Sequence, residues 1–217
     1  MRTSSIPDRF PCYPILHRFR FLPAGLAFLL ALATAQGTSV VPPDFGRLVN
    51  ESDYIVRAVV KSVTAEERTM PSGTRMIFSK VELEVSQVIA GQPPARLVLQ
   101  VLGGQIGDRE LSIAGAPKFA AGEESIFFVQ GNGRQIYPLV RMMHGLYRIR
   151  KEAATGREYL TRSNGEPLRN VDEISRPIES ATAGPALPRQ LEAEALSPAD
   201  FVLKIRATAT KPALREH

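Results

Sequence analysis

Residues 77–89 read Ile-Phe-Ser-Lys-Val-Glu-Leu-Glu-Val-Ser-Gln-Val-Ile, and this stretch decides the fold class. Its apolar side chains alternate with polar ones such as Lys80 and Glu82. Because successive side chains of a strand point to opposite faces of a sheet, the alternation predicts a strand with one buried face and one exposed face. The alternation loses its parity at Val88 and Ile89, where we expect a β-bulge or a sharp bend.

Weaker alternations of the same kind lie on both sides of this stretch. They cover residues 54–60, 97–101, 111–113, 146–150 and 158–161. We expect the last two to form a hairpin. Residues 126–129, Ile-Phe-Phe-Val, are apolar at every position, which predicts a strand covered on both faces.

Short clusters of Gly, Pro, Asn and Ser separate these predicted strands, and no long helical pattern lies between them. Parallel strands need long crossover connections, whereas antiparallel strands can be joined by tight turns. The sequence therefore predicts a mainly β domain, either an antiparallel barrel or a sandwich.

A short helix is expected before the first strand. Pro43 and Asp44 suit a first helical turn, and Phe45, Leu48 and Val49 share one face at helical spacing. This helix has an apolar face that the β domain can cover.

The chain changes character after the last predicted hairpin. We expect residues 163–196 to form a linker, because much of this segment is rich in Ala, Pro and Glu. Ser197 then provides an N-cap with Asp200 three residues later, so residues 197–208 predict a short amphipathic helix docked on the β domain. Residues 209–217 are expected to be a loose tail.

Residues 1–35 have the three parts of a secretory signal peptide. Four arginines precede an apolar run from Phe21 to about Leu32, and Ala33-Thr34-Ala35 supplies small residues at the exit. We expect cleavage near Ala35 and export to the periplasm or to the outside of the cell. An uncleaved leader that tethers the protein to the membrane is the alternative, but its apolar part is shorter than the roughly 20 residues of a spanning helix.

The composition of the mature chain bears on its partners and on how it is stabilised. Beyond residue 35 it carries 23 basic and 21 acidic residues, a balance that favours neither nucleic acid nor an anionic membrane surface as a partner. Its single cysteine, Cys12, lies in the leader, so the mature protein has no disulfide and is stabilised by its core.

The stretch from Leu48 to Val129 resembles a group of uncharacterised exported bacterial proteins with an OB-type β-barrel, similar to netrin-like and metalloprotease-inhibitor domains. The matching segments are Ser52-Asp53-Tyr54-Ile55-Val56, residues 85–91, Val101-Leu102-Gly103-Gly104 with Gly107, Gly115-Ala116-Pro117-Lys118-Phe119, and Gly122-Glu123 before Phe127-Phe128-Val129. Two positions depart from the pattern: Ala90 stands where the group usually has Lys, and Ala58 stands where it favours Gly.

The resemblance implies a small antiparallel OB-like barrel, which we place at residues 36–162. It implies no activity, because the group itself has none established. Netrin-like inhibitors grip a catalytic zinc through an N-terminal cysteine, and the mature chain lacks a cysteine. That mechanism is therefore not carried over.

Catalytic patterns are weak in this sequence. Nucleophilic catalysis of the Ser-His-Asp type needs a histidine, and the mature chain has only His144 and the terminal His217. We interpret His144 as a turn or partly buried residue with a local hydrogen bond. One internal histidine also makes a zinc site improbable, and the carboxylates of Asp108, Glu110, Glu123 and Glu124 lack a calcium-loop pattern.

These observations predict an exported, non-enzymatic interaction module of the cell envelope or extracellular space. We expect an exported protein as its partner, no cofactor and no bound metal, no nucleic acid, and contact with a membrane only if the leader is retained. The alternatives are a secreted hydrolase built on carboxylates, with His144 in a cleft, and a membrane-tethered envelope protein. The candidate contact surface comprises Gly103, Gly104, Asp108, Pro117, Met142, Met143 and His144.

Overall fold

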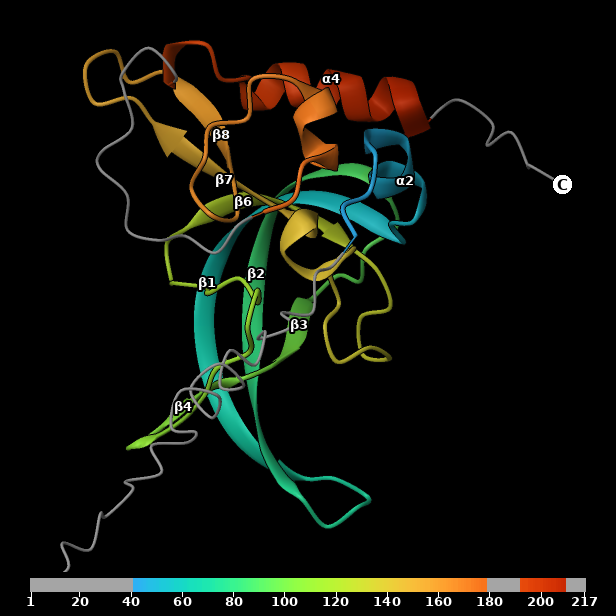
Figure 1. The fold of residues 1–217 in the computed structure, drawn as a ribbon, viewed down its shortest axis with the longest axis vertical. Helices are drawn as coiled ribbons and strands as arrows, with labels where there is room; N and C mark the ends of the chain where they lie inside the picture. The colour runs from blue at the N-terminus through green and yellow to red at the C-terminus, as the bar shows by residue number, and fades with distance from the viewer. Residues whose placement is uncertain (1–40, 179–191, 210–217) are drawn as a thin grey trace, which may run out of the picture. The chain divides into compact units, whose positions relative to one another are not determined.

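The computed structural model describes residues 41–178 and 192–209. Within these ranges an antiparallel sheet has the strand order β3-β2-β1-β6-β7-β8 (Figure 1). Its strands are β1 (Tyr54–Thr69), β2 (Arg75–Gly91), β3 (Leu97–Leu102), β6 (Glu124–Val129), β7 (Leu146–Lys151) and β8 (Glu158–Arg162). A separate ribbon pairs β4 (Gly104–Ile106) with β5 (Arg109–Leu111). The prediction of a mainly β fold is thus confirmed.

The sheet does not close into a barrel, so the expected closure of the strands is wrong. The two edge strands are β3 and β8, and the edge of β8 is covered by a later part of the chain. There the amide of Leu168 donates to the Leu160 carbonyl, and the Leu160 amide donates to the Leu196 carbonyl. An open sheet with both faces covered also suits residues 126–129, which are all buried.

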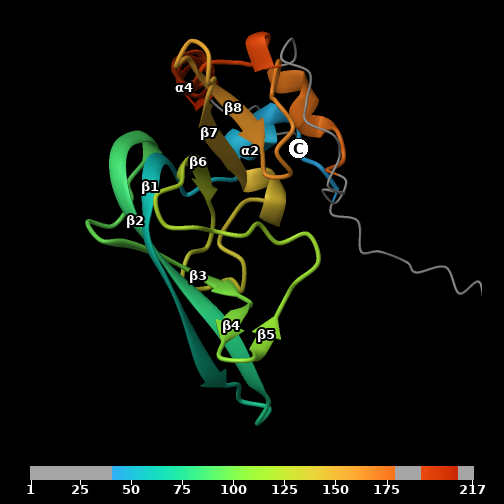
Figure 2. The same ribbon diagram turned by 90° about the vertical axis from the view of Figure 1, so that its left-hand side faces the viewer.

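A long curved hairpin of β1 and β2 extends away from the helices (Figures 1 and 2). Three shifts of register bend it, and they leave Ile89, Ser86 and Lys61 as extra residues. A bulge residue lacks a partner opposite it and increases the local twist of the pair. The bulge expected at Val88 and Ile89 is therefore confirmed, and the other two were not apparent in the sequence.

One face of the sheet is covered by helices. Helix α2 (Phe45–Asn50) begins at Asp44, whose carboxylate accepts a hydrogen bond from the Arg47 amide. Helix α4 (Pro198–Ala209) begins after Ser197, whose hydroxyl accepts from the Asp200 amide. Both expected helices are confirmed, and α4 packs Phe201, Val202 and Ile205 into the core shared with β6 and β7.

The segment after β8 contributes to the same core. It contains the short 3-10 helix η2 (Val171–Ser175), and the side chains of Leu168 and Ile174 are completely buried. The first part of the expected linker thus belongs to the folded domain. Residues 192–196 at its end also join the domain, where the Leu196 amide donates to the Leu168 carbonyl. Residues 179–191 lie outside the described residues, as do the leader and residues 210–217 of the expected tail.

The other face of the sheet forms a second core. Its residues are Tyr54, Val56, Ala58, Val60, Val81, Leu83, Leu97, Leu99, Val101, Phe127, Val129, Leu139 and Leu146. No long helix covers this face in the described ranges. The ribbon β4–β5 and the segment 112–119 lie over it instead. Met143 of the 3-10 helix η1 (Met142–Gly145) lines a hollow with that segment, and these irregular elements frame the candidate site.

Candidate binding surface

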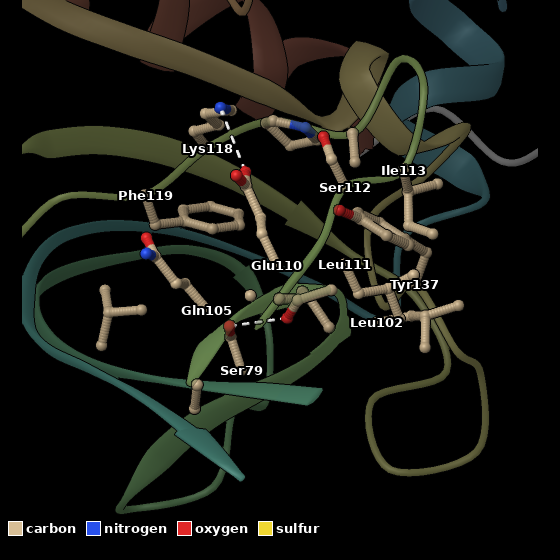
Figure 3. A pocket seen from close by; sticks show the side chains of 17 residues that line it. Ser79, Leu102, Gln105, Glu110, Leu111, Ser112, Ile113, Lys118, Phe119 and Tyr137 are labelled. Atoms are coloured by element: carbon tan, nitrogen blue, oxygen red, sulfur yellow. Dashed lines mark hydrogen bonds and ion pairs between the residues drawn. The ribbon is translucent and has the colours of Figure 1, made fainter. Parts of the chain in front are cut away.

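A cavity of about 380 Å³ lies between the sheet and the segment that follows β3 (Figure 3). Its floor includes a row of side chains across three strands: Ala65 of β1 lies opposite Ser79 of β2, and Ser79 lies opposite Val101 of β3. Val63, two residues before Ala65 on the same face, extends the floor. The floor is therefore built from regular sheet, which fixes its shape.

Two glycines allow the chain to turn tightly over this floor. Gly103 and Gly104 have φ angles of 107° and 140°, in the region that side-chain-bearing residues rarely adopt. A Cβ on Gly104 would lie 2.4 Å from the hydroxyl oxygen of Ser79, and one on Gly103 would lie 2.8 Å from the Leu111 carbonyl oxygen. The Ser79 hydroxyl donates a 2.7 Å hydrogen bond to the Gly103 carbonyl. This contact fastens the ribbon β4–β5 to the sheet.

The segment 112–119 forms a wall between this cavity and a second hollow of about 360 Å³. Ser112, Ala116 and Pro117 line both spaces, and Met143 and Arg148 line only the second. The wall is held at its end by Phe119, whose ring stacks on that of Phe127 at a centroid distance of 6.4 Å.

Arg148 of β7 holds the same wall by charge. One guanidinium nitrogen donates to the Lys118 carbonyl oxygen at 2.6 Å, and another lies 2.5 Å from the Glu123 carboxylate. The Arg148 side chain is only 11% exposed, so the ion pair is largely shielded from water. The wall is therefore part of the folded structure and not a free loop.

The lining of the first cavity combines apolar side chains with polar groups in about equal share. Figure 3 shows Gln105 and Phe119 on one side, opposite Leu102 and Tyr137. Burial raises the pKa of Tyr137 to about 12, so its phenol is neutral and able to donate a hydrogen bond at neutral pH.

Charges lie only at the rim of this cavity. The Lys118 ammonium is 3.9 Å from the Glu110 carboxylate, and both side chains are well exposed, so this pair contributes little to stability. An apolar group with a few polar atoms fits such a space better than an ion does.

The structure brings together four of the seven predicted contact residues. Gly103, Gly104 and Pro117 line the first cavity, and Pro117 and Met143 line the second hollow. The contact between wall and η1 is close, because a Cβ on Gly115 would lie 2.3 Å from the methyl carbon of Met143.

Two further predicted residues lie elsewhere. Asp108 is exposed in the turn between β4 and β5 and lines neither space. Met142 lines a separate open hollow with Arg141 and Tyr137. Both Arg141 and Met142 have positive φ angles, of 50° and 56°, so this entry to η1 is strained.

His144 is buried, with 1% of its surface exposed, and it lines none of these spaces. It therefore lies apart from the four candidate contact residues that line the two spaces. Burial, and then the charge of nearby Arg162, lower the pKa of His144 to about 4, so the imidazole is neutral. Its main-chain amide donates a local hydrogen bond to the Arg141 carbonyl, whereas its Nδ1 atom has no hydrogen-bond partner among the described residues.

The loop carboxylates do not converge on a common point. Glu123 pairs with Arg148, and Glu124 pairs with Arg57. Among residues 41–178 and 192–209, no group of three or more His, Cys, Asp or Glu side chains is placed to hold a metal ion.

Sequence reasoning missed Ser79, Tyr137 and Arg148 as parts of this surface. Ser79 gave a usable signal, because it is a polar residue at an inward position of an otherwise apolar alternation. Tyr137 and Arg148 gave none, since their place depends on how distant segments pack.

In the described ranges no helix is both long enough and apolar enough to cross a membrane. Comparison of the sequence with protein-family models and with curated proteins finds no match.

Proposed function

We propose that this protein is an exported, non-enzymatic interaction module whose first cavity receives an apolar side chain of an exported partner protein. The observation that carries the proposal is the cavity itself, with a floor of regular sheet and a wall fixed by Arg148 and Phe119. Preorganised pockets of this kind lower the cost of ordering the site on binding. The leader predicted at residues 1–35 supports the exported location of the partner.

Two features favour binding over hydrolysis. His144, the histidine on which a hydrolase would rely, is buried beside the guanidinium of Arg162 and lines neither cavity. The carboxylates near the cavity are exposed or paired with arginines. A general base needs hydrogen-bond reach to its substrate, and His144 lacks that access here.

Capture from cells tests the proposal. The full chain carries a C-terminal tag, is purified from the envelope and culture fluid of its source, and its co-purifying proteins are identified by mass spectrometry. Intact mass of the same sample distinguishes a cleaved leader from a retained one, and so separates the exported module from the membrane-tethered alternative.

A matched pair of variants then locates the binding site. Ala116→Trp fills the space at a position that lines both hollows, whereas Ala154→Trp adds the same side chain to the exposed turn between β7 and β8. Loss of one dominant exported partner with Ala116→Trp alone supports the proposal, provided both variants keep the far-ultraviolet circular dichroism of the wild type. Equal capture by both variants contradicts it.

A further inference from the structure

β1 continues well beyond the end of its neighbour β6. The last pair between them is Val59 with Glu124, and Val60 then exchanges hydrogen bonds with the chain just before β6. Its amide donates to the Glu123 carbonyl, and its carbonyl accepts from the Gly122 amide. From Lys61 onward, that side of β1 has no neighbouring strand in the part of the chain that the structure describes.

The hydrogen-bond pattern shows which residues present their main chain at this open edge. At the hairpin turn the Met70 amide donates to the Thr74 carbonyl, so this pair is a hydrogen-bonded one. Such pairs alternate along an antiparallel ladder. The even-numbered residues from Ser62 to Arg68 therefore bond to β2, and Val63, Ala65 and Glu67 direct their amides and carbonyls away from it.

A hydrogen bond on the other side of β2 agrees with this alternation of inward and outward residues. The Gly103 amide donates to the Ile77 carbonyl, so the main-chain groups of Ile77 point toward β3 and away from β1. Within the described ranges the main-chain groups of Val63, Ala65 and Glu67 have no hydrogen-bond partner on the open side. Unpaired groups at strand spacing are the template that an added strand recognises.

The open edge also borders the cavity. Val63 and Ala65 line the cavity, and Val63 is 40% exposed, so the cavity opens at this edge of the sheet. Figure 2 shows the ribbon β4–β5 beside this arm of the hairpin. A residue paired with Ala65 on an added strand would project its side chain to the same face as Ala65, which is the face of the cavity.

We propose that the edge of β1 from Val63 to Glu67 binds an extended segment of the partner protein as an added strand, with one apolar side chain of that segment in the cavity. This inference rests on the proposed function and specifies its partner. The unpaired amides and carbonyls account for the extended main chain, and the apolar part of the lining accounts for the side chain. A volume of about 380 Å³ is near the lower end of small-molecule pockets and suits one side chain.

Charged side chains at the two ends of the open edge of β1 limit the length of the added strand. The Glu67 carboxylate accepts a 2.7 Å hydrogen bond from Arg109 of β5 and lies 3.7 Å from a guanidinium nitrogen of Arg75. Charged side chains on an edge oppose indefinite pairing with further chains. Lys61, the bulge residue, limits the other end. Between these two charged positions, Val63 and Ala65 present uncharged side chains to the cavity.

Amide exchange measured by NMR on the full chain tests the edge directly. In the free protein, the amides of Val63, Ala65 and Glu67 should exchange faster than those of Thr64, Glu66 and Arg68. The capped peptide Lys-Thr-Thr-Leu-Thr-Thr-Lys should slow the first three, and the same peptide with central Gly should bind about tenfold more weakly, because it leaves the cavity empty. Equal exchange of all six amides in the free protein, or no response to the leucine peptide, would overturn the inference.

Two proline variants separate this inference from the proposed function. Ala65→Pro removes an outward amide beside the cavity, and Thr69→Pro removes one at the far end of the arm, each without loss of a bond to β2. Loss of partner capture with Ala65→Pro but not with Thr69→Pro supports strand addition. Capture retained by Ala65→Pro but lost with Ala116→Trp overturns strand addition and leaves the proposed function in place. If Ala65→Pro and Ala116→Trp both still capture the partner, strand addition and the proposed function are both overturned.

Discussion

The guanidinium of Arg148 lies 2.5 Å from the carboxylate of Glu123, and the same guanidinium donates to the Lys118 carbonyl of the cavity wall. The two side chains are 11% and 23% exposed. Without Arg148, the Glu123 carboxylate keeps one ion pair among the described residues, the longer and more exposed contact to Arg150 at 3.5 Å. We expect Arg148→Leu to lower the free energy of unfolding by about 2–3 kcal/mol, measured by urea denaturation.

A surface ion pair provides the control for this prediction. Arg141 lies 3.1 Å from Glu51, and its side chain is 45% exposed. Arg141→Leu should therefore change the free energy of unfolding by less than about 0.5–1 kcal/mol. Similar effects of the two substitutions would show that the Arg148–Glu123 pair stabilises the fold no more than a surface pair does.

The buried imidazole of His144 predicts a stability loss in mild acid. In the unfolded chain the pKa is the ordinary 6.5, and in the folded protein it is about 4. Between these values the unfolded state binds the proton, so stability is highest above pH 6.5 and falls as the pH drops toward 4. The free energy of unfolding should fall by about 2–3 kcal/mol between pH 7 and pH 4.5.

The variant His144→Leu checks the origin of this dependence. His17 and His217 lie outside the described residues, and carboxylates titrate mainly below this window, so His144 is the described group that accounts for it. Urea denaturation at a series of pH values should show a flatter profile for His144→Leu. An unchanged slope would mean that His144 is accessible to protons in the folded state.

Much of this fold could be predicted from the sequence, because strands and amphipathic helices leave periodic patterns. The alternation in residues 77–89 correctly predicted a strand, and its loss of parity at Ile89 correctly predicted a bulge. Residues 126–129, apolar at every position, correctly predicted a strand buried on both faces. Barrel closure could not be predicted this way. It depends on which chain segment meets the outer edge of β8, and here residues 166–168 and Leu196 do so.

The candidate site was predicted less completely than the fold. Gly103, Gly104, Pro117 and Met143 were found from turn chemistry and composition. The three-residue strand β4 is too short to show an alternation, and it was not predicted. The burial of His144 depends on Arg162 and the segment after β8, which was expected to be a linker.

A side chain at position 104 should strain the local structure. Its φ of 140° and the 2.4 Å approach of a Cβ to the Ser79 hydroxyl both oppose a side chain. Gly104→Ala should lower the free energy of unfolding by about 2–3 kcal/mol, measured by thermal and urea denaturation. Part of this loss should be recovered in the double variant with Ser79→Ala, which removes the clashing oxygen.

Gly107 is the matched control, because it also has a positive φ, of 56°, but a Cβ there meets no atom within 4 Å. Gly107→Ala should therefore cost only about 1 kcal/mol. A loss as large as that of Gly104→Ala would indicate that backbone conformation alone, and not the approach to Ser79, decides the cost.

The docking of α4 depends on Phe201. Its ring lies 5.1 Å from that of Tyr147 and 6.0 Å from that of Phe128, centroid to centroid, and it is completely buried. Phe201→Ala should lower the free energy of unfolding by about 3–5 kcal/mol. Leu203 is 64% exposed on the same helix, and Leu203→Ala should have an effect below about 0.5 kcal/mol. Equal effects would mean that α4 does not pack against the sheet.

Site-specific photo-crosslinking in intact cells tests most directly whether the partner binds at the cavity. The photoreactive residue benzoylphenylalanine replaces exposed Ser112, which lines both hollows, or Ala154 in the turn between β7 and β8 as the control. The proposed function predicts one dominant crosslinked exported protein from position 112 and none from position 154. Crosslinking from position 154 alone, or from neither position, would contradict it.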